Sequence, residues 1–214
     1  MKSMHSARLR SPLAAMALLV LAGCSILGSK QSDPTTIYAP QPQVATDPSW
    51  PAVAWQLSVG RPTAPRMVDS PRIAVRPATG ELQVYKGASW SQPSTDLVEA
   101  TVLRALEDSG RIPAVARDGS GIRADYKLIM DLRRFESDYA GTAIPSATIE
   151  LTAKLMHASD QRIVASRTFL QVQPSSGTEV AEVTSAFDQA LGKLGAEVTG
   201  WVLVTGEADA RNKP

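Results

Sequence analysis

The residue with the clearest chemistry is Cys24, the only cysteine in this chain of 214 residues. It follows an apolar run at residues 13–22, and the first ten residues carry three cations and no acid, which is the pattern of a secretory signal peptide. The tetrapeptide Leu21-Ala22-Gly23-Cys24 resembles the bacterial lipobox, in which small side chains flank the cleaved bond and the thiol receives diacylglycerol. We therefore expect residues 1–23 to be removed as a signal peptide. The alternative is an ordinary signal peptide that ends beside an incidental cysteine.

Lipidation of Cys24 would hold the chain on a membrane that it does not cross. The expected groups are a covalent diacylglycerol on the thiol and an acyl chain on the new amino terminus, and we predict no other cofactor. Anchoring by several chains is effectively permanent, because each buried CH2 contributes about 0.8 kcal/mol. Ser25 follows the cysteine. In Gram-negative lipoproteins an aspartate there favours the inner membrane, so Ser25 indicates an outer-membrane anchor with the protein facing the periplasm.

Other reactive groups are sparse in the mature chain. His5 leaves with the signal peptide, so His157 is the one mature histidine, and no thiol is left once Cys24 is acylated. Metal sites usually need three or four ligands, and we therefore predict no metal site. A serine hydrolase would have to use His157, but the chain has no Gly-x-Ser-x-Gly motif. We interpret His157 as a structural residue at a strand end and predict no catalytic residue; a small hydrolase acting through His157 is the alternative.

The charge balance argues against a nucleic-acid partner. The whole chain has 22 basic and 21 acidic residues, and three of the basic ones leave with the signal peptide. Such a small net charge gives no electrostatic attraction to nucleic acid. Two sets of arginines could contact anionic lipid headgroups or an acidic partner, but we favour the solvated edges of strands for both. They are the pair Arg133-Arg134 and the group Arg61, Arg66, Arg72 and Arg76.

The chain divides into a signal peptide (1–23), a lipidated cysteine with a proline-rich tether (24–51), one folded domain (52–205) and a flexible tail (206–214). Prolines spaced through a polar sequence disfavour helix in the tether and favour extended backbone. Only the tripeptide at residues 36–38 could dock there as an edge strand. The mature length suits a single hydrophobic core.

Hydrophobic periodicity predicts strands before and after a first helix, and a long helix at the end. The first helix opens with Asp96 followed three residues later by Glu99, which resembles a capping box. A tight turn at residues 158–160 predicts that the last two strands form an antiparallel hairpin. The predicted strands are 55–59, 72–76, 82–86, 126–133, 148–155 and 162–172, and the predicted helices lie at 93–109 and 179–204.

Small residues recur every four positions in the last helix, at Gly192, Ala196 and Gly200. Glycine in a helix costs roughly 1 kcal/mol relative to alanine, so this row predicts a close approach by the sheet or by a neighbouring chain. A homo-oligomer formed through this row is therefore one hypothesis.

Two short segments resemble a known family. One is Pro71-Arg72 followed by an apolar strand, and the other is Gly87-x-x-Trp90 shortly before a leucine-rich helix. With the lipobox and the proline-rich segment, this arrangement resembles the ABC-type transport auxiliary lipoproteins, which accompany mammalian-cell-entry (MCE) domain proteins and include the lipoprotein of the paraquat-inducible Pqi system. The family often has Tyr-Tyr-x-Leu near the mature amino terminus, and residues 36–39 match that pattern only in part.

The resemblance implies both a fold and a role. The fold is α/β: a single compact domain with a mixed β-sheet and helices packed on it, similar to the amino-terminal domain of the TolB propeller protein. The implied role is non-enzymatic. The protein would dock an MCE-domain protein, with its ABC permease and ATPase, and would help to move lipid or another hydrophobic substrate across the envelope. An outer-membrane assembly or structural lipoprotein without a transport role is the alternative.

Overall fold

The computed structural model describes residues 34–212. The predicted signal peptide, the lipobox and Cys24 lie outside the described residues, so their assignment stays a prediction. Among the residues that are described, no helix combines the length and the apolar character needed to cross a bilayer.

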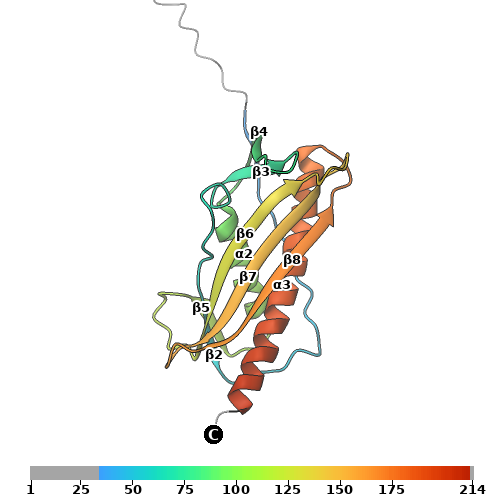
Figure 1. Cartoon of the computed structure of the whole chain (residues 1–214). Coiled ribbons are helices and arrows are strands. Elements are labelled where there is room, and N and C mark those ends of the chain that lie inside the picture. Colours follow the sequence, from blue (N-terminus) through green and yellow to red (C-terminus); the bar gives the residue numbers. More distant parts are fainter. Residues whose placement is uncertain (1–33, 213–214) are drawn as a thin grey trace, which may run out of the picture. The chain divides into compact units, whose positions relative to one another are not determined.

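Eight strands form one mixed sheet, and two helices pack on one of its faces (Figure 1). This arrangement confirms the predicted α/β fold with helices on a mixed sheet. The strands are β1 (Thr36–Tyr38), β2 (Gln56–Val59), β3 (Arg72–Arg76), β4 (Gln83–Trp90), β5 (Ala114–Arg117), β6 (Tyr126–Asp138), β7 (Ser146–His157) and β8 (Ile163–Pro174), and the helices are α2 (Ser94–Asp108) and α3 (Val180–Arg211).

The long strand β6 organises the sheet. One of its edges pairs antiparallel with β7, which in turn pairs antiparallel with β8, as the predicted hairpin requires. Its other edge pairs in parallel with two short strands, with β2 near its start and with β3 near its end. β5 extends the sheet beyond β2, while β4 and then β1 extend it beyond β3. The sheet therefore has β8 at one edge and short strands at the others.

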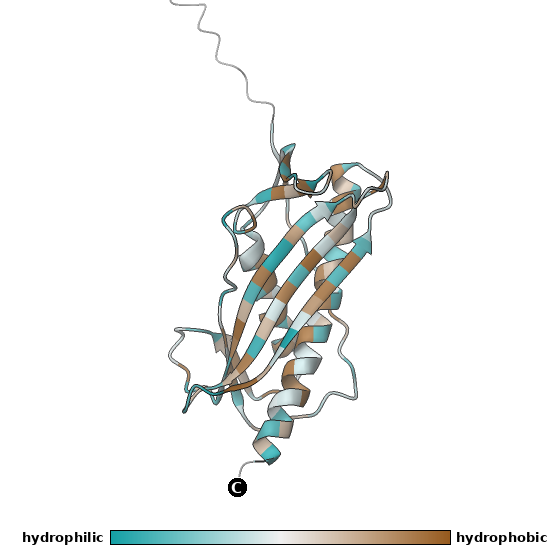
Figure 2. Ribbon diagram, in the orientation of Figure 1, coloured by the Kyte–Doolittle hydropathy of each residue, from teal (hydrophilic) through white to brown (hydrophobic). Residues whose placement is uncertain are grey.

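The core lies between the sheet and the two helices. Alternate residues of β6 and β7 are buried on the helix side, and Figure 2 shows the resulting alternation of hydrophobic and hydrophilic residues along the strands. Full burial of each large aliphatic side chain contributes about 1.5–3 kcal/mol, so this face supplies much of the stability. The fully buried members include Leu128, Leu132, Ile149 and Leu151 from the sheet and Leu106 and Phe187 from the helices.

The helix starts differ from those predicted. α2 begins at Ser94 after Pro93 without a side-chain cap, so the predicted capping box is wrong. Asp96 instead pairs with Arg61, and Glu99 pairs with Arg117. A capping box does form at α3, where the backbone N–H of Glu179 donates to Oε2 of Glu182 at 3.1 Å.

The end of α3 also differs from the prediction. We predicted a tail from Gly206, but α3 continues to Arg211. Gly206 is buried against the indole ring of Trp55, and a Cβ at this position would collide with that ring. The glycine is thus a site of close packing within the helix and does not end it.

Three strands differ most from the sequence prediction: β5, β6 and β4, the last of which runs to Trp90 instead of ending at residue 86. β5 was not predicted, because its four residues, Ala114–Arg117, show no clear alternation and become a strand only by pairing with β2. β6 runs five residues past its predicted end, through a bulge between Leu132 and Arg134 that interrupts the apolar alternation. The tripeptide at 36–38 does dock as the edge strand β1, in parallel with β4.

Candidate functional site

Residues 39–50, which we call the strap, cross the surface of α3 instead of forming a tether. The backbone N–H of Gln41 donates to Oδ1 of Asp188 at 2.7 Å. Further along, the ring of Trp50 packs on Gly200 and is 91% buried. The predicted tether boundary at residue 51 is therefore too late, since the folded part starts at Thr36.

The small-residue row of α3 explains how the strap fits. A Cβ at Gly192 would lie 2.6 Å from the carbonyl oxygen of Gln43, and a Cβ at Gly200 would lie 2.6 Å from Nε1 of Trp50. The close approach predicted from this row is real, but the approaching segment is the strap of the same chain and neither the sheet nor a neighbouring chain. Sequence reasoning missed the strap. The signal that could have revealed it is a large aromatic residue, Trp50, in a proline-rich segment of a chain whose last helix carries a row of small residues.

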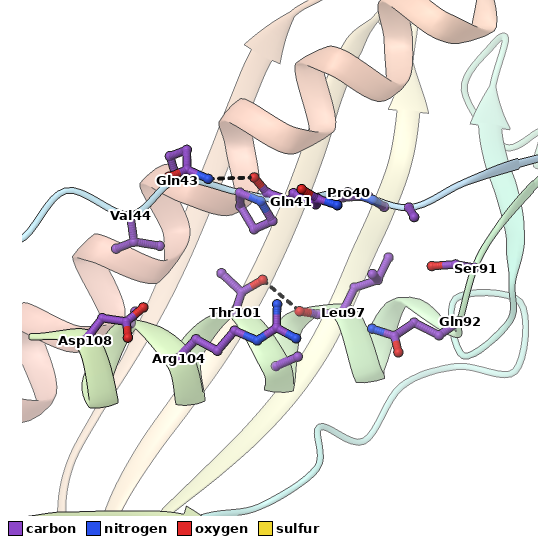
Figure 3. A pocket seen from close by; sticks show the side chains of 14 residues that line it. Pro40, Gln41, Gln43, Val44, Ser91, Gln92, Leu97, Thr101, Arg104 and Asp108 are labelled. Atoms are coloured by element: carbon purple, nitrogen blue, oxygen red, sulfur yellow. Dashed lines mark hydrogen bonds between the residues drawn. The ribbon is translucent and has the colours of Figure 1, made fainter.

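A groove of about 530 Å³ lies between the strap and α2 (Figure 3). Its titratable side chains are Arg104 and Asp108, which are four residues apart on α2 and form no ion pair with each other. The hydroxyl of Thr101 donates to the carbonyl oxygen of Leu97 at 2.8 Å, and so it is satisfied within the helix. The lining offers hydrogen-bonding groups and no nucleophile beside a base, so it suits binding better than catalysis.

The motif residues come together around Trp90, which is almost fully buried in the core. Its ring lies edge-on to Phe135 and Phe187, with centroid distances of 5.8 and 5.2 Å. Its backbone N–H donates to the carbonyl oxygen of Pro71 at 2.6 Å, which joins the two segments of the motif. Trp90 thus fixes the turn before β3 against the end of β4.

Arg72 and Gly87 have different surroundings from Trp90. Arg72 is exposed and pairs across the sheet with Ser89. Gly87 has a φ of 67°, which favours glycine, and lies where the pairing of β3 with β4 shifts register. Arg72 forms no ion pair with another described residue, and Gly87 has no side chain. These two motif residues therefore shape the backbone of β3 and β4, and the Arg72 side chain stays available at the surface.

Arg134 belongs to an ion-pair cluster centred on the buried carboxylate of Glu136. Its guanidinium contacts Glu136 at 2.7 Å and Asp138 at 2.5 Å, and Arg76 contacts Glu136 at 2.8 Å. Burial raises the pKa of Glu136, but the hydrogen bonds from Arg76 and Arg134 outweigh it and hold the pKa below its ordinary value. Arg133, in contrast, is half exposed beside Asp131 and Glu150. Arg133 and Arg134 therefore bind different acidic partners and do not form a continuous basic surface.

A second cluster holds the turn before β3 against the start of α2. Arg61 bridges Asp69 at 2.8 Å and Asp96 at 2.6 Å, and the hydroxyl of Thr95 also donates to Asp69. Hydrogen bonds from Arg61 and then Thr95 lower the pKa of Asp69. Sequence reasoning missed this cluster, because residues 61, 69 and 96 carry no shared spacing.

His157 is buried at the end of β7, as predicted for a structural histidine. Its Nδ1 lies 3.0 Å from the hydroxyl of Ser159 and 3.1 Å from Oδ1 of Asp160. A catalytic triad needs the serine and the carboxylate on opposite ring nitrogens, whereas both lie at Nδ1 here. These three residues therefore do not form a triad, and within residues 34–212 no group of three or more His, Cys, Asp and Glu side chains could hold a metal ion.

Comparison with known proteins gives the family. An uncharacterized protein of Bradyrhizobium diazoefficiens is 27% identical over 148 residues, which is 69% of this chain but only 39% of the length of that protein. A protein of Xanthomonas campestris known from its crystal structure is 59% identical and matches with a TM-score of 0.81, over 83% of this chain and 100% of the other. An uncharacterized protein of known crystal structure shares the fold alone, with 12% identity and a TM-score of 0.59 over 78% of this chain and 97% of that one.

The family match covers most of the described chain. Residues 36–199 match the family of ABC-type transport auxiliary lipoprotein components, from β1 to the middle of α3. That family is described as a component of transport systems and not as a group of enzymes. The chain therefore belongs to the ABC-type transport auxiliary lipoprotein family.

Proposed function

We propose that this protein is a lipid-anchored adaptor that docks an MCE-domain protein of an ABC transporter and helps to move lipid or another hydrophobic molecule across the envelope. The match of residues 36–199 to the transport auxiliary family carries the proposal. Cys24 bears the diacylglycerol and the acyl chain, and Ser25 directs the protein to the outer membrane with its domain in the periplasm. The adaptor role is non-catalytic, and a separate permease and ATPase supply the energy.

The sheet offers the docking surface. The face of β6, β7 and β8 opposite the helices is open in the described part of the chain (Figure 1). Within residues 34–212, β8 pairs with β7 alone, so one edge of a 12-residue strand is unpaired. Leu170 and Val172 on this strand are 55% and 56% exposed. An unpaired edge with apolar side chains favours main-chain pairing with a partner strand.

The first test is recovery of partners from solubilised envelopes, with the full-length lipidated protein as bait and mass spectrometry of the bound proteins and lipids. We expect an MCE-domain protein together with a permease and an ATPase. The double variant Leu170→Lys with Val172→Lys should reduce that recovery at least several-fold. Ile163→Lys is the matched control, because Ile163 is 45% exposed at the other end of the same strand.

The identity of the recovered proteins distinguishes a transport role from an assembly role, and the yield from the double variant tests the β8 edge. Recovery of outer-membrane assembly proteins with no MCE-domain protein would replace the transport role by an assembly or structural role. Recovery of the MCE protein with equal yield from the double variant and from wild type would keep the transport role and exclude β8 as the docking edge.

A further inference from the structure

The reach of the proposed lipid anchor is limited because β1 is already part of the sheet. Thr36, the first residue of β1, is the twelfth residue after Cys24. An extended chain spans at most about 3.3–3.6 Å per residue, so β1 lies within about 43 Å of the anchored cysteine. A tether ending at residue 51 would have allowed more than twice that distance. The reach is also shorter than α3, whose 32 residues extend over about 48 Å. This step rests on the proposed anchor at Cys24.

The sheet edge formed by β1, the described strand closest in sequence to Cys24, exposes both apolar and basic side chains. Ile37 of β1 and Arg72 of β3 both pair with Ser89 of β4, so they lie in one row across three strands and on the same face. Ile37 is 66% exposed, more than any other large hydrophobic residue of the described chain. Arg66 and the exposed Met67 lie in the turn shortly before Arg72.

Three basic residues near this edge have no ion-pair partner in the described part of the chain. Neither Arg66 nor Arg72 forms an ion pair with a residue in the range 34–212, and the same holds for the exposed Lys86 in the bulged part of β4. The neighbouring acids Asp69 and Asp96 share Arg61 as their ion-pair partner, so this cluster keeps a formal charge of −1 against +3 on Arg66, Arg72 and Lys86. The net charge of this surface is therefore positive, and with the exposed apolar side chains beside it the surface is complementary to anionic headgroups with acyl chains beneath them.

We infer that Ile37, Arg66, Met67, Arg72 and Lys86, together the β1 edge patch, bind the anionic lipid surface of the membrane that holds Cys24. The three cations contact lipid phosphates, and Ile37 and Met67 enter the interface. The contact fixes which end of the domain faces the bilayer. It leaves the β8 edge, at the opposite side of the sheet, directed away from β1 and accessible to a partner.

The test uses the full-length lipidated protein in nanodiscs of phosphatidylethanolamine, with or without phosphatidylglycerol, and measures backbone hydrogen exchange at residues 36–38 and 65–72. We expect exchange on the order of tenfold slower in the anionic discs, with the difference lost at high salt. The double variant Arg66→Glu with Arg72→Glu should remove the protection. Arg123→Glu is the matched control, because Arg123 is also exposed and without an ion pair among the described residues but precedes β6, far from its β3 end.

Equal exchange in the two kinds of nanodisc, or equal protection in the double variant, would overturn the inference. Circular dichroism verifies that the variants are folded, and Lys86→Glu is a second, single-site variant if the double variant is not. The mass of the amino-terminal peptide reports independently on lipidation. If Cys24 is unmodified, the anchor proposal fails, and the same exchange measurement with added anionic vesicles still tests the patch.

Discussion

The carbonyl oxygen of Gln43 occupies the space that a side chain at Gly192 would need, at 2.6 Å from the position of its Cβ. This contact joins a proline-rich segment to a helix almost 150 residues later in the sequence. Because the obstacle is backbone and not the end of a flexible side chain, it cannot be relieved by a change of rotamer. The strap and the small residues of α3 thus form one packed unit.

Gly192→Ala should destabilise the protein despite the higher helix propensity of alanine. The propensity gain is up to about 1 kcal/mol, while overpacking against a backbone costs about 1–3 kcal/mol, so we expect a net loss of unfolding free energy. Chemical denaturation measures it, with proteolysis at the strap as a second readout. Val204→Ala, at an exposed position of α3, should have no such effect. An unchanged or increased stability of Gly192→Ala would show that the strap does not need this contact.

Glu136 should make stability depend on pH in the acid range. Its pKa is held below the ordinary value of 4.5 by Arg76 and Arg134, against the effect of burial. A lowered pKa in the folded state means that the stabilisation is complete above about pH 4.5 and is lost as the pH falls through the folded-state pKa. Glu136→Gln should cost about 1–3 kcal/mol at neutral pH, because Arg76 and Arg134, whose side chains are 28% and 31% exposed, lose the charge of the buried carboxylate that they share.

The pH profile of that variant separates this carboxylate from others. Below pH 4.5 the difference in unfolding free energy between wild type and Glu136→Gln should shrink. A difference that stays constant from neutral to acid pH would assign the stabilisation to packing and not to the charge of Glu136. Asp118→Asn provides the comparison, since Asp118 forms an ion pair at the exposed surface.

A strain that carries the His157→Gln protein should show the same function in complementation as one that carries the wild type. The imidazole contacts Ser159 and Asp160 through one nitrogen and packs edge-on against Tyr126 at 5.4 Å between ring centroids. We expect a loss of about 1–2 kcal/mol in unfolding free energy from the lost hydrogen bonds and packing. Complementation of a deletion strain is the functional measurement. Loss of function in a folded His157→Gln protein would support the alternative that the protein is a hydrolase acting through His157.

Cys24→Ser should prevent acylation and leave the domain folded. The first strand of the domain begins at Thr36, twelve residues after Cys24, so we expect the melting temperature of the variant to match that of the wild type. Incorporation of labelled palmitate should be lost, and complementation should fail because the protein is no longer anchored at its membrane. Full complementation by an unacylated Cys24→Ser protein would contradict the anchored-adaptor proposal.

The sequence by itself determined the elements whose pattern is local. Alternation along β6 and β7 predicted long half-buried strands, three-and-four spacing predicted α3, and both exist. The sequence also predicted the family, because Pro71-Arg72 and Gly87-x-x-Trp90 are short contiguous motifs. These features depend on neighbours within a few residues, where periodicity reports directly on the buried face.

Tertiary structure alone decided how distant segments meet. The strap was predicted as a tether, because nothing in its own polar, proline-rich sequence shows the glycine-lined surface of α3 that receives it. The roles of Asp96 and Glu99 changed in the same way: both suit a helix cap locally, but Arg61 and Arg117 arrive from other strands and loops and bind them more favourably. β5 became a strand only because β2 offered it a partner. In each case the deciding contact lies far away in sequence, where periodicity carries no information.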